Sequence, residues 1–184
     1  MGIPFDAVFS QTPPLFALII GINVYQMKLK PLRGAVPDGE AFKTYFMNRL
    51  GVPKDHIITL FDREATRTEI IKGFRKLRDN KKIKEGDAIF IFFAGHGGQK
   101  SVPLSWGLGT RNVPMDVILP YDCDAVNEEN SKGVEPIPDH TIGILIDEIA
   151  AEKGNNIVSA LYDVLPYFSP TPYRLLYLTV AVQL

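Results

Sequence analysis

One stretch of the sequence constrains the fold more than any other. Five apolar residues in a row, Ile89 to Phe93, lead through Ala94 into Gly95-His96-Gly97-Gly98. An apolar run without polar alternation indicates a strand buried on both faces, as in a parallel sheet covered by helices. Glycines beyond such a strand let another backbone come close. The segment therefore predicts that His96 lies at the carboxyl edge of a buried sheet, where α/β proteins bind their ligands.

Apolar runs and amphipathic stretches alternate along much of the chain, which favours an α/β fold with a parallel sheet. The pattern Thr66-Arg67-Thr68-Glu69 is typical of a capping box, and Asp139 is a candidate N-cap of a later helix. The expected elements are strands at 15–22, 56–61 and 87–93, helices at 41–50, 66–77 and 139–153, and a fourth strand beginning after residue 156.

Two segments depart from this alternation. Residues 98–138 are rich in Gly, Pro, Asn and Asp, which predicts a long excursion with a small hairpin. Residues 158–184 contain only two charged residues, and three prolines interrupt them. The predicted organisation is an N-terminal extension (1–14), one domain (15–157) and a divergent apolar tail (158–184). As an alternative, residues 158–161 or 175–182 of this tail pair with the open sheet edge.

Composition and charge exclude several classes of function. At 184 residues, with 46% hydrophobic and 22% charged residues, the chain has the size and composition of one globular domain. A net charge of −1 gives no reason to expect nucleic acid or an anionic membrane as partner. The apolar run at 15–22 is too short to span a bilayer. A single cysteine predicts a reducing compartment, the cytoplasm or the nucleus.

Five motifs in a fixed order carry a resemblance to a known family. They occupy residues 15–23, 32–38, 86–97, 118–122 and 133–156. In this order they resemble the caspase-like cysteine peptidases, specifically the metacaspases of the fungal type. The resemblance implies a three-layer α/β/α sandwich with a mostly parallel sheet, here missing its C-terminal strands and truncated before the catalytic cysteine.

The resemblance also implies roles for individual residues. His96 would be the catalytic base, which deprotonates the nucleophilic thiol or protonates the leaving amine. Gly97 would supply one backbone N–H of the oxyanion hole. Asp38 would line the pocket for the Arg or Lys side chain that precedes the cut, because a carboxylate suits a guanidinium. A helix N-cap is the alternative role for Asp38.

The nucleophile that this chemistry needs has no counterpart in the sequence. The family's cysteine should follow Asn156-Ile157 by roughly seven or eight residues, where Val164 and Leu165 stand. Cys123 is predicted to be an ordinary free thiol, because no helix N-terminus or adjacent cation is evident to lower its pKa. Removing a covalent nucleophile costs on the order of a millionfold in rate. We therefore expect the chain to be catalytically incompetent.

Calcium is the one cofactor that the resemblance suggests. Oxygen ligands for it could come from Asp122, Asp124 and Asp139 together with Glu128 and Glu129. Their spacing is not that of a recognised calcium loop, and solvated loop acids are the alternative. The sequence assigns no metal ligand.

Several functional interpretations remain open. The first is a caspase-like cysteine endopeptidase domain, directed at Arg or Lys, that has lost its nucleophile. The alternative is a non-catalytic pseudo-peptidase that binds a peptide or regulates an intact metacaspase paralogue. A retained intron beginning at Val158-Ser159 would instead make an active peptidase the true product. A hydrolase that uses Ser101 or Ser105 as nucleophile is a weaker option, since neither lies on a strand–turn–helix elbow.

Overall fold

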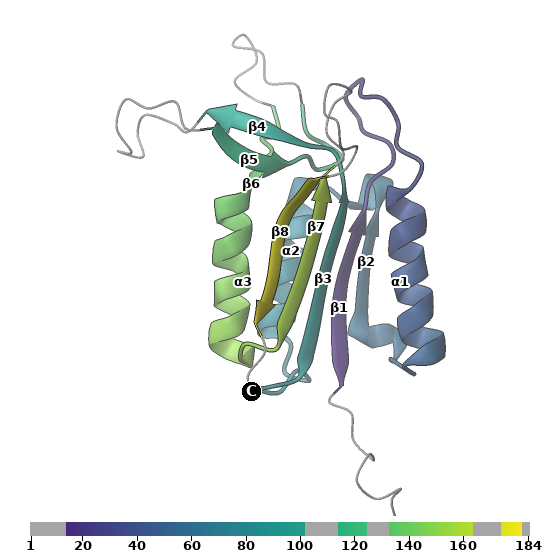
Figure 1. The fold of residues 1–184 in the computed structure, drawn as a ribbon, viewed down its shortest axis with the longest axis vertical. Helices are drawn as coiled ribbons and strands as arrows, with labels where there is room; N and C mark the ends of the chain where they lie inside the picture. Colours follow the sequence, from purple (N-terminus) through teal and green to yellow (C-terminus); the bar gives the residue numbers. More distant parts are fainter. Residues whose placement is uncertain (1–13, 102–113, 125–132, 164–173, 182–184) are drawn as a thin grey trace, which may run out of the picture.

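The computed structural model describes residues 14–101, 114–124, 133–163 and 174–181, and these form two sheets and three α-helices (Figure 1). In chain order the elements are β1 (Leu15–Gly21), α1 (Ala35–Arg49), β2 (Ile57–Phe61), α2 (Arg67–Asp79), β3 (Ala88–Gly95), β4 (Gly97–Ser101), β5 (Pro114–Ile118), β6 (Ile137–Pro138), α3 (Asp139–Lys153), β7 (Ile157–Asp163) and β8 (Arg174–Ala181). Two short 3₁₀ turns, Lys54–His56 and Asp62–Glu64, flank β2.

The larger sheet has the strand order β2-β1-β3-β7-β8. Its first four strands are parallel, and β8 pairs with β7 in the antiparallel direction. The register sets Ala94 opposite Gly21 and Gly95 opposite Asp163, so the carboxyl ends of the three inner strands lie at one edge. This confirms the predicted α/β fold with a mostly parallel sheet, and His96 follows β3 directly at that edge.

Alternate residues of the strands enter two separate cores. Phe16, Leu18 and Ile20 of β1 pack with residues of α2 and α3, whereas Ala17 and Ile19 pack with residues of α1. The sheet therefore has α2 and α3 on one face and α1 on the other (Figure 1). This is the predicted three-layer α/β/α sandwich.

The helix starts follow local capping chemistry. Thr66 Oγ1 accepts a hydrogen bond from the backbone N–H of Glu69 at 3.2 Å, so the residue predicted to open α2 is its N-cap. Asp122 Oδ1 accepts a second one from the N–H of Arg67 at 2.8 Å. The first helix begins at Ala35, six residues before the expected range, and Gly51 follows its end with a positive φ of 65°.

The end of the chain adds two strands to the larger sheet. The fourth strand expected after residue 156 is β7, which continues past the predicted domain boundary at residue 157 and pairs with β3 through Asp163. Residues 158–163 lack charge until Asp163 because a strand buried between two helix layers needs apolar or small side chains on both faces. The two segments predicted as alternatives for pairing with the open sheet edge both form strands: residues 158–161 lie in β7, and residues 175–181 lie in β8. Residues 164–173 lie outside the described ranges.

The excursion after β3 contains the predicted hairpin. Strands β4 and β5 pair in the antiparallel direction, and β6 pairs with β5, which makes a second, three-stranded sheet. This sheet stands above the carboxyl edge of the larger one (Figure 1). Residues 102–113 and 125–132 lie outside the described ranges.

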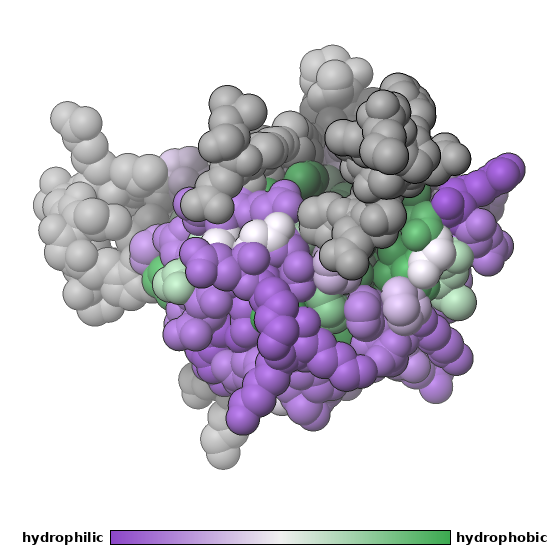
Figure 2. Space-filling model, turned by 90° about the horizontal axis from the view of Figure 1, so that it is seen from below, coloured by the Kyte–Doolittle hydropathy of each residue, from purple (hydrophilic) through white to green (hydrophobic). Residues whose placement is uncertain are grey.

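The surface is polar where the strands begin. Viewed from below, the described surface is mostly hydrophilic, and hydrophobic colour is confined to smaller areas (Figure 2). None of the helices among the described residues is both long enough and apolar enough to cross a membrane.

Candidate active site

The backbone around His96 is closely packed. A Cβ atom on Gly95 would lie 2.6 Å from the Tyr25 hydroxyl oxygen and 2.8 Å from Cζ of Phe93. Side-chain atoms do not approach so closely, so a larger residue at position 95 would force the ring of Tyr25 or Phe93 to move. The glycine that the sequence places before His96 thus has a packing reason.

Two contacts from one loop fix His96. Its backbone N–H donates to the Tyr25 hydroxyl at 2.6 Å, and the two rings lie 5.2 Å apart between centroids. Its Nε2 lies 2.8 Å from the Lys30 carbonyl oxygen. Because a carbonyl only accepts, Nε2 must carry the proton of that contact. In the neutral imidazole the basic lone pair then belongs to Nδ1, which defines the atom that would accept a proton.

The loop that carries these contacts, residues 22–34, is itself anchored. Asp62 Oδ1 accepts hydrogen bonds from the N–H groups of Asn23 at 2.7 Å and Val24 at 3.1 Å. Asp62 has a φ of 45°, a conformation that Asp tolerates better than most residues. Further along, Gln26 N–H donates to the Tyr121 carbonyl at 2.9 Å. The orientation of His96 therefore depends on residues far from it in sequence.

Gly97 is the first residue of β4, and a regular antiparallel ladder would leave its N–H unpaired with β5. Leu119 N–H donates to the His96 carbonyl at 3.0 Å, and Gly97 pairs with Ile118 in the next register position. Hydrogen-bonded and non-hydrogen-bonded pairs alternate in an antiparallel ladder, so the Gly97 N–H points away from β5. That direction is compatible with the predicted oxyanion-hole role, which stays a prediction.

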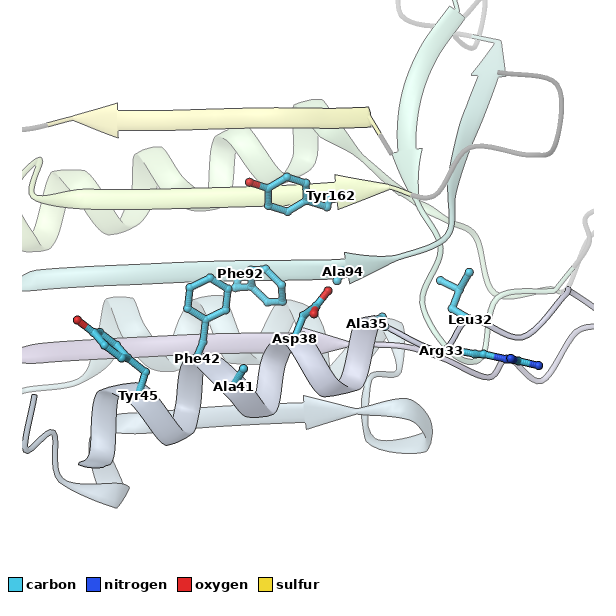
Figure 3. A pocket seen from close by; sticks show the side chains of 11 residues that line it. Leu32, Arg33, Ala35, Asp38, Ala41, Phe42, Tyr45, Phe92, Ala94 and Tyr162 are labelled. Carbon is cyan, nitrogen blue, oxygen red and sulfur yellow. The ribbon is translucent and has the colours of Figure 1, made fainter. Parts of the chain in front are cut away.

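Asp38 lies in a pocket and not at a helix N-cap. Helix α1 begins at Ala35 with Gly34 at the N-cap, so the alternative role for Asp38 is wrong. The Asp38 side chain lines a cavity of about 890 Å³ between α1 and the strands β3 and β7 (Figure 3). Ala94, two residues before His96, also lines this cavity. The fold thus brings the predicted base and the predicted pocket residue to the same edge of the sheet.

The predicted nucleophile position follows β7. Asp163, the last residue of that strand, pairs with Gly95, so β7 ends next to the segment that carries His96. Val164 and Leu165, where the family's cysteine is expected, lie outside the described residues.

Cys123 is a free thiol, as predicted, and the structure shows that it is buried. Its side chain is 3% exposed, and its Sγ lies 3.6 Å from the Asp124 carbonyl oxygen. Burial, followed by the negative charges of Asp122 and Asp124, raises the pKa of Cys123 to about 11. At neutral pH the group is a protonated thiol and therefore a poor nucleophile.

Two of the acidic residues considered for calcium, Asp122 and Asp139, have other partners. Asp122 caps α2 through Arg67, and Asp139 Oδ1 accepts a hydrogen bond from the N–H of His140 at 2.6 Å. Within the ranges that the structure describes, no three His, Cys, Asp or Glu residues lie close enough to hold a metal ion. Glu128 and Glu129 lie outside those ranges, so a calcium site stays a prediction.

Sequence reasoning missed Tyr25 and Lys30. Tyr25 follows the first strand by four residues, a position from which it can reach the neighbouring strand end, but a lone tyrosine gives no specific signal. Lys30 acts through its main-chain carbonyl, which no residue type marks.

Comparisons with known proteins concern the family and the fold of the chain. The family model described as Caspase domain matches residues 15–131. Metacaspase-1A of Aspergillus oryzae is 33% identical over 89 residues, which are 45% of this chain and 20% of that protein. Metacaspase-6 of Arabidopsis thaliana is 28% identical over 136 residues, which are 71% of this chain and 36% of that protein. The chain thus spans between a fifth and about a third of these relatives.

A solved structure shows the same fold. The crystal structure of protein GSU0716 from Geobacter sulfurreducens matches with a TM-score of 0.58 and 19% identity, covering 80% of this chain and 48% of that chain. At that identity the likeness concerns the arrangement of helices and strands alone.

Proposed function

The chain belongs to the caspase domain family, and from this premise we propose that it is a caspase-like peptidase domain that binds peptides at Arg or Lys but lacks the thiol needed to cleave them. One observation carries the proposal: His96, with its ring oriented by the Lys30 carbonyl, lies at the same sheet edge as the pocket that holds Asp38. In this proposal the protein acts on peptide ligands in the cytoplasm or nucleus.

The proposed chemistry follows from the geometry. A basic side chain would pair with the Asp38 carboxylate, and the Gly97 N–H would donate to the peptide carbonyl oxygen. With a thiol beside it, Nδ1 of His96 would take the thiol proton and later give it to the leaving amine. Cys123, the single cysteine of the chain, is buried and protonated, so this step has no nucleophile.

A non-catalytic regulator is the second candidate. It is favoured by one contrast: the loop that orients His96 and the pocket residue Asp38 are both in place, whereas the sequence has no cysteine after β7. In that case the domain binds a peptide or an intact metacaspase paralogue and alters its activity. Calcium is then a ligand to test, and its binding to this chain should be measured both alone and in the presence of the paralogue.

The first test measures binding by the purified chain. N-acetylated, C-amidated Ala-Ala-Arg should bind saturably, and its norleucine counterpart, which has a similar length and no charge, should bind at least about tenfold more weakly. Asp38→Asn should remove this difference. Glu40→Gln, on the same helix but paired with Lys43, is the matched control and should retain it. Equal affinity for the two peptides would contradict the proposal.

Turnover is the second readout. The chain should not hydrolyse an Arg-ending fluorogenic peptide, with or without calcium. Separate Val164→Cys and Leu165→Cys variants test whether a thiol at either expected position restores hydrolysis that also depends on His96. If the unaltered chain hydrolyses the peptide and the His96→Ala variant does so as well, hydrolysis does not use His96, and the proposed mechanism is wrong.

A further inference from the structure

The pocket beside α1 is larger and more apolar than one basic side chain requires. A volume of about 890 Å³ is typical of sites that enclose a whole small ligand. Of the described residues that line it, Asp38 is the one carboxylate, and four carry aromatic rings: Phe42, Tyr45, Phe92 and Tyr162. Asp38 accounts for recognition of a cation and leaves the aromatic part of the pocket unexplained.

The carboxylate and the rings follow one another along α1. Asp38 points from α1 toward β3, and Phe42 and then Tyr45 lie progressively farther from the carboxyl edge (Figure 3). Four residues of helix separate Asp38 from Phe42, a rise of about 6 Å. In an extended peptide, side chains two residues apart point the same way with a spacing of about 6.6 Å. The spacing of the two side chains on α1 therefore matches that of an i and i+2 pair in an extended ligand.

The aromatic part has a buried floor and an exposed rim. Phe92 is 2% exposed, and its ring lies 4.8 Å from that of Phe42 and 6.2 Å from that of Tyr162. At the rim, Tyr45 is 54% exposed and Tyr162 is 40% exposed. A ligand side chain placed among these rings would cover exposed apolar area of Tyr45 and Tyr162, and removing that area from water favours binding.

We propose that this pocket recognises a two-residue pattern, namely a basic residue bound by Asp38 and a large apolar or aromatic residue two positions away, bound among the four aromatic rings of the pocket. The inference rests on the proposed function, because it takes Asp38 as the partner of the basic side chain. The ligand class is a cationic, amphipathic peptide in extended conformation. The rival occupant of the rings is a second cation held by cation–π contacts.

Four N-acetylated, C-amidated tripeptides separate these occupants: Ala-Ala-Arg, Phe-Ala-Arg, Arg-Ala-Phe and Arg-Ala-Arg. Their affinities for the purified chain are measured by calorimetry at constant salt. One of the two phenylalanine peptides, whichever has the correct chain direction, should bind about tenfold tighter than Ala-Ala-Arg. Failure of both to exceed Ala-Ala-Arg would overturn the inference, as would a gain shown by Arg-Ala-Arg in their place.

Variants locate the effect in the pocket. Tyr45→Ala and Tyr162→Ala should each reduce the phenylalanine advantage at least about threefold and leave the affinity for Ala-Ala-Arg unchanged. Leu50→Ala is the matched control, because Leu50 is also 54% exposed and does not line the pocket. A phenylalanine advantage that survives both tyrosine variants would overturn the assignment. Loss of the Arg-over-norleucine preference would instead contradict the proposed function itself.

Discussion

The two faces of the larger sheet are built differently. On the face of α2 and α3, large side chains such as Phe74 (1% exposed) and Ile70 (0%) are sealed from solvent, and Arg78 of α2 pairs with Glu148 of α3 at 2.6 Å. On the face of α1, Tyr45 and Tyr162 remain partly exposed around a cavity of about 890 Å³. The first face stabilises the domain, and the second holds the candidate binding site.

Strand β3 serves both faces at once. Ile91 and Phe93 enter the closed core, whereas Phe92 and Ala94 contribute to the core on the α1 side and line the pocket. Alternation of side chains along the strand thus lets one segment contribute to stability and to binding through different residues. The two properties should therefore respond to different mutations.

The largest expected effect is on the closed face. Phe74→Ala should lower the free energy of unfolding by about 3–5 kcal/mol, because it leaves a cavity in a core that α2 and α3 close. Phe42→Ala, on the open face, should cost only about 1–2 kcal/mol, since the Phe42 side chain is half-buried beside an existing cavity. Urea unfolding of both variants checks this order. Equal costs would mean that the two faces are packed alike.

A smaller effect is expected at the loop that borders the open face. Asp62→Ala removes the acceptor of two backbone N–H groups and places alanine at a φ of 45°, so it should cost about 2 kcal/mol. It should also change the NMR signals of the His96 imidazole, because two of the contacts of His96 are made by residues 22–34. Asp62→Asn keeps an oxygen acceptor and tolerates the same φ. If His96 responds equally to both variants, the loop does not orient it in this way.

The smallest effects distinguish two glycines in helices of the closed face. A Cβ on Gly73 would lie 2.8 Å from Cδ1 of the buried Leu18, whereas one on Gly143 would meet nothing within 4 Å. Gly73→Ala should therefore destabilise by about 1 kcal/mol, the strain outweighing the gain in helix propensity. Gly143→Ala should stabilise by about 0.5–1 kcal/mol. Thermal melts of the pair suffice, and a stabilised Gly73→Ala would show that Leu18 can move aside.

Periodicity explains which parts of the fold the sequence predicts. The buried strands at 15–22 and 87–93 lack polar alternation, and Thr66 with Glu69 marks the start of α2, so these elements occur as expected. The start of α1 was missed because Gly34 caps it without a side chain. The strand expected after residue 156 is β7, but residues 158–163 were also assigned to a tail, because a short apolar run has the same composition in a strand as in an unpaired segment. Only the pairing with β3 separates the two.

The candidate site was predictable only where side chains carry it. His96 and Asp38 stand in recognisable motifs, and the fold brings both to one sheet edge. The aromatic part of the pocket combines Phe42 and Tyr45 of α1 with Tyr162 of β7, a tertiary contact that no local pattern indicates.

The contact between His96 and Lys30 has an evolutionary consequence. Its acceptor is a main-chain oxygen, so the amino acid at position 30 can change freely as long as the path of the backbone is kept. The orientation of His96 thus depends on the loop after β1, whereas a nucleophile at the expected position would belong to the segment after β7. A Gly-His-Gly motif with an oriented histidine is therefore compatible with either the presence or the absence of a nucleophile, and by itself it is no evidence of an active peptidase.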